Sequence, residues 1–578
     1  MKEKIYHGIG VSEGIRVGKA LVYGSRVLPH ADRTITAEEV PAELERLQNA
    51  VEQAKKEVDR LIVCASSQLK GTEAEVIRGQ KTFLSDPAFC PAMKKLVKEK
   101  QYAPEKAVRA VTEQYASLFA NMDNAYMRER AADVRDAGRR LLRYLTGSET
   151  VHLKHLTEPV ILVADDLSPS DTIQFDRSCI LAFATQKGGK TSHTSIFAKS
   201  LGIPAIVGIP NLLEQIKTGD TVILDGQQGT FTLSPTPQTT EVYSARIKRE
   251  EERKERYMQA SRQNAHTLDG KRIVAAANIG SAADAQNSLA MGAEGAGLFR
   301  TEQMYLSRSS APTEEEQFAV YKKVAKIYGH RRVIVRTLDI GGDKEVDYLG
   351  IAKESNPFLG CRAIRYCLRN EHVFLTQLRA ILRASVYGSI AVMFPMISGL
   401  QELRRAKDML QKAKEQLKAL HLPFDESIPV GIMVEVPAAA IMSDILAKEV
   451  DFFSIGTNDL VQYTLAVDRG NETISYLYDY FDPAVIRLIQ HTSQAAHTAG
   501  IPLGMCGAMA GDPLAVPLLV GLGLNELSMP AGSLPQVKYL MGRLSAGSCR
   551  RLTEQVMSCR TAQQVRLVLQ DYQNKNKE

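Results

Sequence analysis

The sequence lacks the hydrophobic segments that a membrane protein needs. No window approaches the roughly 18 uninterrupted apolar residues of a transmembrane helix, and the first five residues contain no apolar core of a signal peptide. We therefore expect a cytoplasmic protein. The eight cysteines form no CxxC pair and no zinc-type spacing, a pattern typical of reduced, mostly buried thiols in a large cytosolic chain.

The chain also lacks a strong charge of either sign. A net charge of +6 is modest for 578 residues, and the basic residues lie among acids along helical stretches instead of forming a long block. This distribution is typical of a solvated surface, and neither aromatic residues nor motifs support nucleic-acid binding.

At 578 residues the chain is too long for a single core, and its 44% hydrophobic content is ordinary for a globular protein. Short strands with glycine turns are predicted near the N-terminus, followed by long amphipathic helices, and β-like runs return from about residue 160. We predict an α/β domain formed by residues 1–36 and 147–239, interrupted by a helical insertion of residues 37–146.

The rest of the chain predicts a linker and a barrel. Residues 240–262 form a charged helical stretch without a clear apolar face, which suits a connector between domains. Residues 263–578 then alternate strands and helices in about eight βα units, the rhythm of a (β/α)8 barrel. The candidate strands are Ile273–Ala277, Gly295–Phe299, Val333–Arg336, Ile390–Pro395, Val430–Glu435, Phe452–Gly456, Leu503–Cys506 and Glu526–Met529.

Polar side chains gather at the ends of these candidate strands. In a (β/α)8 barrel, residues at the C-terminal ends of the strands line the active site. One charged residue at a strand end would be unremarkable, but six convergent polar residues favour a catalytic mouth. The six are Arg300, Arg336, Glu435, Asn458, Asp459 and Cys506.

These residue types indicate a phosphorylated ligand. Arg362 and Arg469 add to the two strand-end arginines, and guanidinium groups are planar forks suited to phosphate and carboxylate. Glu435 and Asp459 supply hard oxygen ligands, few in number, as expected for a Mg²⁺ site that shares its other positions with substrate and water. The expected ligand is therefore a small phosphorylated carboxylic acid.

Three residues near this mouth also have ordinary explanations. Arg365 fits a surface partner and Lys344 fits a solvated loop charge. Cys506 alone would most often be a small buried apolar residue, but at a strand end that faces arginines and a metal it fits a proton donor.

A separate histidine motif lies in the N-terminal half. Residues 188–194 read Gly-Gly-Lys-Thr-Ser-His-Thr, and a short helical pattern follows that Gly202 closes. Glycines let the backbone approach a ligand closely, and a helix start offers unpaired N–H groups and the positive end of its dipole. Because this environment stabilises an anion, His193 is placed to carry a phosphoryl group. The alternative is a histidine that only caps a helix.

Together these segments resemble enzyme I of the bacterial phosphoenolpyruvate-dependent sugar phosphotransferase system, over essentially the whole chain. The histidine motif alone also occurs in pyruvate phosphate dikinase and phosphoenolpyruvate synthase. That class needs a large nucleotide-binding domain, whereas this chain has no Walker-type glycine loop and no spare segment of several hundred residues. The segments that carry the resemblance are residues 127–136, 189–194, 292–302, 312–318, 336–344, 356–365, 431–437, 456–460 and 504–507.

The resemblance implies a phosphoenolpyruvate-protein phosphotransferase. Phosphoenolpyruvate (PEP) would bind in the barrel mouth, and Mg²⁺ would bridge Glu435, Asp459 and the substrate. His193 Nε2 would attack phosphorus in line, and Cys506 would protonate the enolate to give pyruvate. The residues that the resemblance assigns to the phosphate are Arg300, Arg336, Arg469, Asn458 and Asp459, with help from Arg362.

The resemblance also implies partners. Thr172 matches a hydroxyl that the family places against the histidine ring, an orienting role. His193 would then pass the phosphoryl group to a histidine of the phosphocarrier HPr, which docks on the helical insertion. This transfer is the first general step of sugar uptake, and the family's barrels pair as homodimers.

The sequence departs from the family pattern around the histidine. The usual acid is replaced by Gln186, a positive charge is added as Lys187, and an arginine becomes Lys190. An Arg-to-Lys change loses the bidentate fork but keeps the charge, so we expect phosphoryl chemistry to survive. Ala508 replaces an acid beside Cys506, which affects the protonation step.

The helical insertion also departs from the family pattern. Around residues 75–83, basic and neutral residues stand where relatives are often acidic. HPr docking in the family relies partly on acidic groups there, and a mismatch would mainly slow association. We therefore expect a specialised or less basic carrier. The alternative is a regulatory paralogue that signals through binding alone, against which the retained mouth residues argue.

Overall fold

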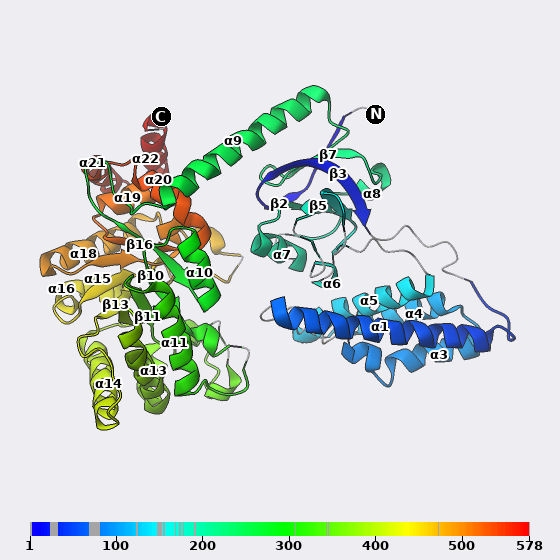
Figure 1. The fold of residues 1–578 in the computed structure, drawn as a ribbon, viewed down its shortest axis with the longest axis horizontal. Coiled ribbons are helices and arrows are strands. Elements are labelled where there is room, and N and C mark those ends of the chain that lie inside the picture. Colours follow the sequence, from blue (N-terminus) through cyan, green and yellow to red (C-terminus); the bar gives the residue numbers. More distant parts are fainter. Residues whose placement is uncertain are drawn as a thin grey trace. The chain divides into compact units, whose positions relative to one another are not determined.

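The computed structural model divides the chain into two compact units, Met1–Glu250 and Glu251–Glu578 (Figure 1). Each unit has its own hydrophobic clusters. The structure describes residues 3–23, 33–68, 81–122, 125–146, 153, 156–167, 169–172, 175–176, 178–189, 192–306, 308–342, 344, 346–471 and 473–576.

An eight-stranded mixed sheet forms the centre of the first unit, with strand order β1-β8-β7-β3-β4-β5-β6-β2. The strands β3 to β6 pair in parallel, and β4 is the apolar run Val160–Ala164, almost wholly buried as a central parallel strand should be. The other strands are β1 (Lys4–His7), β2 (Ile9–Ser12), β3 (Ile15–Tyr23), β5 (Ile180–Thr185), β6 (Ala205–Val207), β7 (Thr221–Asp225) and β8 (Thr230–Leu233), and the helices of this part are α6 (Pro169–Thr172), α7 (His193–Leu201) and α8 (Leu212–Gln215).

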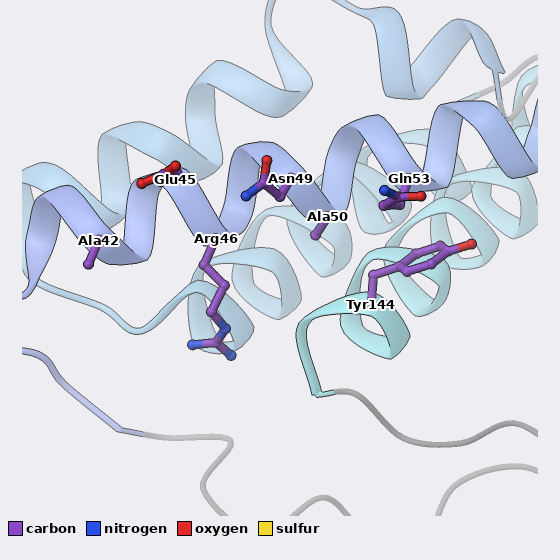
Figure 2. A pocket seen from close by; sticks show the side chains of 7 residues that line it. All are labelled: Ala42, Glu45, Arg46, Asn49, Ala50, Gln53 and Tyr144. Carbon is purple, nitrogen blue, oxygen red and sulfur yellow. The ribbon is translucent and has the colours of Figure 1, made fainter.

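Long helices occupy the sequence between β3 and β4, as the amphipathic pattern predicts. They are α1 (Val40–Gln68), α3 (Phe89–Lys100), α4 (Pro104–Ala120) and α5 (Ala125–Thr146). Their apolar faces share one core, in which Phe89 and Tyr115 meet edge to face. A pocket of about 360 Å³ opens between α1 and α5 (Figure 2), lined by Ala42, Glu45, Arg46, Asn49, Ala50, Gln53 and Tyr144.

Helix α9 (Pro237–Ser261) connects the two units along the sequence. In its first half, Arg246 pairs with the buried carboxylate of Asp225 at 3.0 Å. At its end, the buried Lys538 donates a hydrogen bond of 2.9 Å to the carbonyl of Ser261. A cation that binds the last carbonyl of a helix complements the helix dipole, so Lys538 stabilises the C-terminal end of α9.

The second unit is a closed barrel of eight parallel strands, which confirms the predicted fold. The strands are β9 (Val274–Ile279), β10 (Ala296–Arg300), β11 (Val333–Arg336), β12 (Ile390–Phe394), β13 (Val430–Val434), β14 (Phe452–Ile455), β15 (Leu503–Met505) and β16 (Glu526–Met529). The helices are α10 (Ala282–Ala290), α11 (Glu314–Tyr328), α12 (Ile364–Arg369), α13 (Glu371–Ala384), α14 (Leu400–Ala419), α15 (Pro437–Ile441), α16 (Ser443–Leu446), α17 (Thr457–Leu465), α18 (Pro483–Ala499), α19 (Val516–Gly521), α20 (Leu534–Met541), α21 (Ala546–Met557) and α22 (Ala562–Lys575), with short 3₁₀ turns between them.

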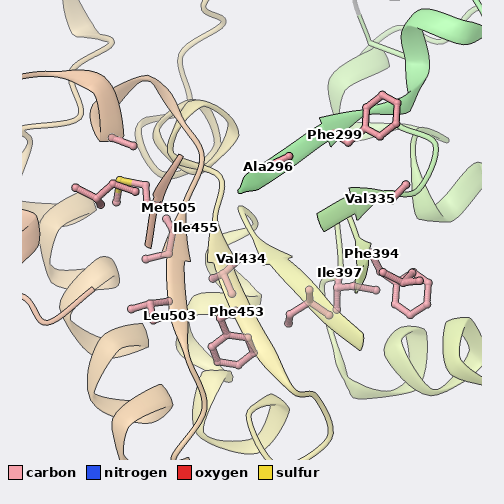
Figure 3. Packing of buried hydrophobic residues seen from close by; sticks show 14 of the residues in the cluster. Ala296, Phe299, Val335, Phe394, Ile397, Val434, Phe453, Ile455, Leu503 and Met505 are labelled. Carbon is pink, nitrogen blue, oxygen red and sulfur yellow. The ribbon is translucent and has the colours of Figure 1, made fainter. Parts of the chain in front are cut away.

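The strands alternate between two apolar layers, as the period of two in a strand requires. One layer packs against the helices, as in the edge-to-face contacts of Phe299 with Tyr321 of α11 and of Phe394 with Phe374 of α13. Figure 3 shows part of this outer layer. The inner layer fills the barrel with Leu298, Ile334, Ala391, Met393, Met433, Phe452 and Cys506. None of the helices in the described ranges has the length and apolarity needed to cross a membrane.

Gly431 shows how tightly the barrel is filled. A Cβ atom at Gly431 would lie 2.5–2.6 Å from the ring of Phe452, which is itself 1% exposed. We expect Gly431→Ala to lower the free energy of unfolding of the barrel by about 1–3 kcal/mol, because the ring has nowhere to move. Urea denaturation followed by circular dichroism measures this change. Gly532→Ala is the control, since its added carbon meets nothing within 4 Å, and an equal loss in both variants would contradict the prediction.

Candidate active site

The barrel register places three of the predicted residues at the inner mouth. Arg300, Arg336 and Glu435 each lie two positions beyond an inner-layer residue, respectively Leu298, Ile334 and Met433. Side chains on one face of a strand recur every second residue, so these three continue the inward-facing rows. Arg300 and Arg336 are the last residues of β10 and β11, and Glu435 directly follows β13. The barrel therefore directs two guanidinium groups and one carboxylate to a common opening.

A network of buried ion pairs surrounds Arg336. Its Nη2 lies 2.7 Å from Glu302 Oε1 and its Nη1 lies 3.0 Å from Asp339 Oδ2. Lys344 Nζ binds the same two carboxylates, at 2.9 Å from Glu302 and 3.6 Å from Asp339. Lys344 is therefore part of the mouth and is not a solvated loop charge.

Arg362 extends the network across the barrel mouth. This guanidinium is 1% exposed, and it reaches Asp339 Oδ1 at 2.9 Å and Asp459 Oδ1 at 3.1 Å. Burial alone would raise the pKa of Asp339, but Arg336, Arg362 and Lys344 hold it well below its usual range. Asp339 therefore stays ionised and holds the two arginines at fixed orientations.

The remaining predicted arginines lie at the edge of this network. Arg300 is half-buried, and within the described residues no carboxylate pairs with it. Arg469 follows α17, where its N–H donates to Gln462 Oε1 at 3.2 Å, and its guanidinium carbon lies 5.9 Å from the ring centre of Phe358. Arg365 is half-buried and donates to the carbonyls of Leu359 and Gly360 at 3.0 and 3.2 Å, so it stabilises its own loop.

Glu435 is a buried carboxylate that forms no ion pair with any of the described residues. It is 1% exposed, and its Oε1 accepts a hydrogen bond of 2.7 Å from the N–H of Met396. Burial raises its pKa to about 8, and the nearby charges of Asp459 and Asp339 add to this effect. Two mutually repelling oxygen donors fit a divalent cation, which would relieve the repulsion. Among the described residues no group of three or more His, Cys, Asp or Glu could hold a metal ion, so substrate and water would complete such a site.

Cys506 lies on the floor of the mouth. It is 3% exposed within the inner layer of the barrel, and burial raises the pKa of its thiol to about 11. The thiol therefore keeps its proton near neutral pH, as a proton donor must. The backbone around it is fixed from both sides: Asn278 Nδ2 donates to the Cys506 carbonyl at 3.1 Å, and the N–H of Ala508 donates to Asn458 Oδ1 at 2.9 Å.

The histidine motif begins helix α7 in the first unit. His193 is the first residue of this helix, and the Ser192 hydroxyl is its N-cap, accepting from the N–H of Ser195. The Ser195 hydroxyl donates to the carbonyl of Gly189 at 2.6 Å, and Gly188 has φ +109°, which a side chain would disfavour. The chain is therefore folded back onto the helix start, and the helix ends at the predicted cap, Gly202. The side chain of His193 and all of Lys190 lie outside the described residues.

The structure gives two of the departures from the family pattern a role. Lys187 Nζ lies 2.7 Å from Asp165 Oδ2, and Gln186 donates to Asp165 Oδ1 at 3.2 Å while accepting from the N–H of Leu213 at 2.8 Å. Burial would raise the pKa of Asp165, but Lys187 and Gln186 lower it below its usual value. The added charge is thus paired. Of the departures around residues 75–83, residues 75–80 fall outside the described residues, whereas Lys81 Nζ lies 2.6 Å from Asp59 Oδ1.

Thr172 lies in α6, the short helix that packs against α7, and it is 4% exposed. The same helix is held to the sheet by the hydroxyl of Tyr23, which donates to Asp171 at 2.7 Å. The residues predicted to act with the histidine are therefore neighbours in the first unit, and those predicted to bind the phosphorylated acid gather in the second.

Sequence reasoning missed several partners in the mouth. Glu302, Asp339 and Tyr463 were not singled out, although the first two lie inside segments that carry the family resemblance. Tyr463 stands four residues after Asp459 on α17, and residues at that spacing share a face of a helix. That spacing is the signal in the sequence that could have found it.

Three family profiles match successive parts of the chain. They describe PEP-utilising enzymes: the N-terminal domain over residues 7–130, the mobile domain over residues 156–229 and the PEP-binding domain over residues 254–546. The barrel with its cationic mouth lies within the PEP-binding match, and the histidine helix lies within the mobile-domain match. Fold and site thus agree with the PEP-utilising class of enzymes.

Curated relatives narrow this class. A protein named phosphoenolpyruvate-protein phosphotransferase from Geobacillus stearothermophilus is 45% identical over 98% of this chain and 97% of its own length. Proteins of the same name from Priestia megaterium (42% identical, 97% of this chain and 98% of the relative) and Staphylococcus aureus (41%, 98% and 99%) also align from end to end. The chain belongs to the phosphoenolpyruvate-protein phosphotransferase family.

The buried network generates a stability prediction. Asp339→Asn keeps the shape of the side chain but leaves Arg336, Arg362 and Lys344 short of one negative charge. We expect a loss of about 3 kcal/mol or more, because an uncompensated buried charge is costly. Thermal and urea unfolding of the barrel measure it. In the control Glu426→Gln, which removes an exposed partner of Lys418 at 3.1 Å, the loss should stay below about 1 kcal/mol. Equal losses in the two variants would contradict the account of the network.

Proposed function

We propose that this chain is the enzyme I component of a sugar phosphotransferase system. It transfers the phosphoryl group of PEP first to His193 and then to a histidine of the phosphocarrier HPr, with release of pyruvate. The observation that carries the proposal is the barrel mouth, where arginines converge beside the carboxylate pair Glu435 and Asp459. The names of the relatives support it.

We further propose how the work is divided along the chain. Residues 1–36 and 147–239 carry the phosphohistidine, residues 37–146 dock HPr, residues 240–262 link the domains, and residues 263–578 bind PEP. The protein acts in the cytoplasm and forms a homodimer through the barrel. The order of elements along the chain supports this division.

The phosphate of PEP would be held by three guanidinium groups, those of Arg300, Arg336 and Arg469, and by the backbone at Asn458 and Asp459. Arg300 is suited to a dianionic group because no carboxylate among the described residues neutralises it. Arg336 is already oriented by Glu302 and Asp339, so little conformational freedom is lost when a ligand binds. Arg362 assists from the opposite side of Asp339.

Glu435 and Asp459 would hold a Mg²⁺ ion together with the substrate. The bound ion supplies positive charge that offsets the negative charge developing on the enolate oxygen. The protein contributes the fixed orientation of Glu435, which the N–H of Met396 holds at 2.7 Å.

Phosphoryl transfer from PEP breaks the bond between phosphorus and the enol oxygen and forms a bond between phosphorus and His193 Nε2. The electron pair left on the enolate then takes a proton at carbon, which gives pyruvate. Cys506 is the proposed donor, since burial keeps its thiol protonated. Positioning and charge stabilisation by the arginines supply the catalysis, as phosphoryl transfer requires.

Thr172 would orient the imidazole of His193 for both transfers. Its burial in α6, beside α7, supports a fixed position for its hydroxyl. From His193 the phosphoryl group would pass to the imidazole of HPr, with no net change in the number of phosphoryl bonds.

Labelled PEP tests the proposed function. Incubation with PEP labelled in the phosphoryl group and Mg²⁺ should place acid-labile label on His193, since phosphohistidine hydrolyses in acid. His193→Ala should take up no label while its thermal unfolding stays that of the wild type. A wild-type protein that takes up no label would instead favour the regulatory paralogue.

Metal dependence tests the carboxylate pair. Glu435→Gln keeps an oxygen for the Met396 N–H but loses a negative ligand, so we expect the Mg²⁺ concentration for half-maximal labelling of His193 to rise by at least about tenfold. Glu526→Gln is the matched control, because Glu526 is an equally buried carboxylate at the start of strand β16 and pairs with Arg332 at 2.9 Å. An unchanged Mg²⁺ requirement in Glu435→Gln would remove Glu435 from the metal site.

A further inference from the structure

A tyrosine and a phenylalanine connect two of the mouth arginines. Tyr463 of α17 accepts a hydrogen bond from Arg362 Nη1 at 3.2 Å and donates one to the carbonyl of Phe358 at 2.6 Å. The same Nη1 also donates to Asp459 Oδ1 at 3.1 Å. Because Asp459 and Tyr463 lie one helical turn apart, both accept hydrogen bonds from Arg362 on the same face of α17.

Phe358 contacts both arginines with its ring. It belongs to the short 3₁₀ turn Pro357–Leu359, and its ring centre lies 5.6 Å from the guanidinium carbon of Arg362 and 5.9 Å from that of Arg469. A guanidinium within about 6 Å of an aromatic ring is attracted to its negative face. One ring therefore touches two cations that come from different loops of the barrel.

Two adjacent glycines make room for this arrangement. A Cβ atom at Gly342 would lie 2.9 Å from the ring of Phe358, and one at Gly341 would lie 2.6 Å from the Cβ of Arg362. Both glycines also have positive φ, +110° at Gly341 and +71° at Gly342, which side chains disfavour. The loop after β11 is thus shaped to receive both residues.

We propose that Tyr463 and Phe358 are positioning residues that hold Arg362 and Arg469 in place for the phosphate of PEP. The inference rests on the proposed function and deepens it. Neither residue acts on the substrate; each acts through a guanidinium group. Tyr463 fixes Arg362 by hydrogen bonds and fixes the turn that carries Phe358, and the ring then sets the distance between the two arginines.

Kinetics of His193 labelling by PEP test the tyrosine. Tyr463→Phe keeps the ring and removes both hydrogen bonds, so we expect the KM for PEP to rise about tenfold with little change in kcat, because an interaction that holds the bound phosphate is lost. Tyr480→Phe is the matched control, since Tyr480 donates a comparable bond of 2.6 Å to Asp512 elsewhere in the barrel. Its KM should stay that of the wild type.

A double variant separates positioning from general stability. If Tyr463 acts through the planar fork of Arg362, then Tyr463→Phe should change KM by less than about twofold when Arg362→Lys has already removed the fork. A purely structural role would raise KM by the same factor in both backgrounds. That equal factor, or an unchanged KM in the single variant, overturns the inference.

Substitutions at Phe358 provide an independent test. Phe358→Leu keeps apolar bulk over Gly342 but removes the aromatic face, and it should raise KM, whereas Phe358→Tyr keeps the face and should restore the wild-type value. An unchanged KM in Phe358→Leu contradicts the role of the ring. Failure of the proposed function looks different, because the wild type itself would then take up no label from PEP.

Discussion

The constraint on which the barrel mouth depends is the pairing of charges that have been removed from water. Three cationic side chains, those of Arg336, Arg362 and Lys344, lie among three carboxylates, those of Glu302, Asp339 and Asp459. An unpaired buried charge costs several kcal/mol, so each of these groups is required by the others. The partners come from the last residue of β11 and from the segments that follow β10, β11 and β14, and the network therefore connects the C-terminal ends of separate strands.

The sequence predicts the position of the mouth but not which of its side chains pair with one another. We could place Arg300, Arg336 and Glu435 because each stands at the C-terminal end of a candidate strand, where a (β/α)8 barrel has its active site. The sequence analysis missed Glu302, Asp339 and Tyr463, because spacing along a loop does not reveal which side chains meet across the barrel. For the same reason, the sequence alone allows Lys344 to be either a mouth residue or a solvated loop charge. Pairing depends on loop geometry, which the sequence pattern alone leaves open.

The sheet of the first unit shows the same limit of sequence reasoning about side-chain pairing. In the sequence, Gln186 replaces an acid of the family pattern and Lys187 adds a positive charge, both near His193. In the structure both contact Asp165, which lies more than 20 residues earlier. Strands β4 and β5 pair in parallel with Ala164 opposite Thr185, so the residues that follow each strand end are brought side by side. Register, more than composition, explains why these two substitutions are compatible with the fold.

The charge balance of the mouth also bears on how ligands enter it. An anion bound alone would meet the carboxylates of Asp339, Asp459 and Glu435 as well as the arginines, and a cation bound alone would meet the arginines as well as the carboxylates. Bound together, each ligand screens the groups that repel the other, so their binding free energies are favourably coupled, and the coupling is reciprocal. The raised pKa of Glu435 agrees with this arrangement, because burial and the charges of Asp459 and Asp339 raise it and the nearby Arg336 and Arg362 offset them only in part. A mouth that presents both guanidinium groups and carboxylates can therefore select a phosphorylated acid and a divalent cation as a pair, in preference to either one alone.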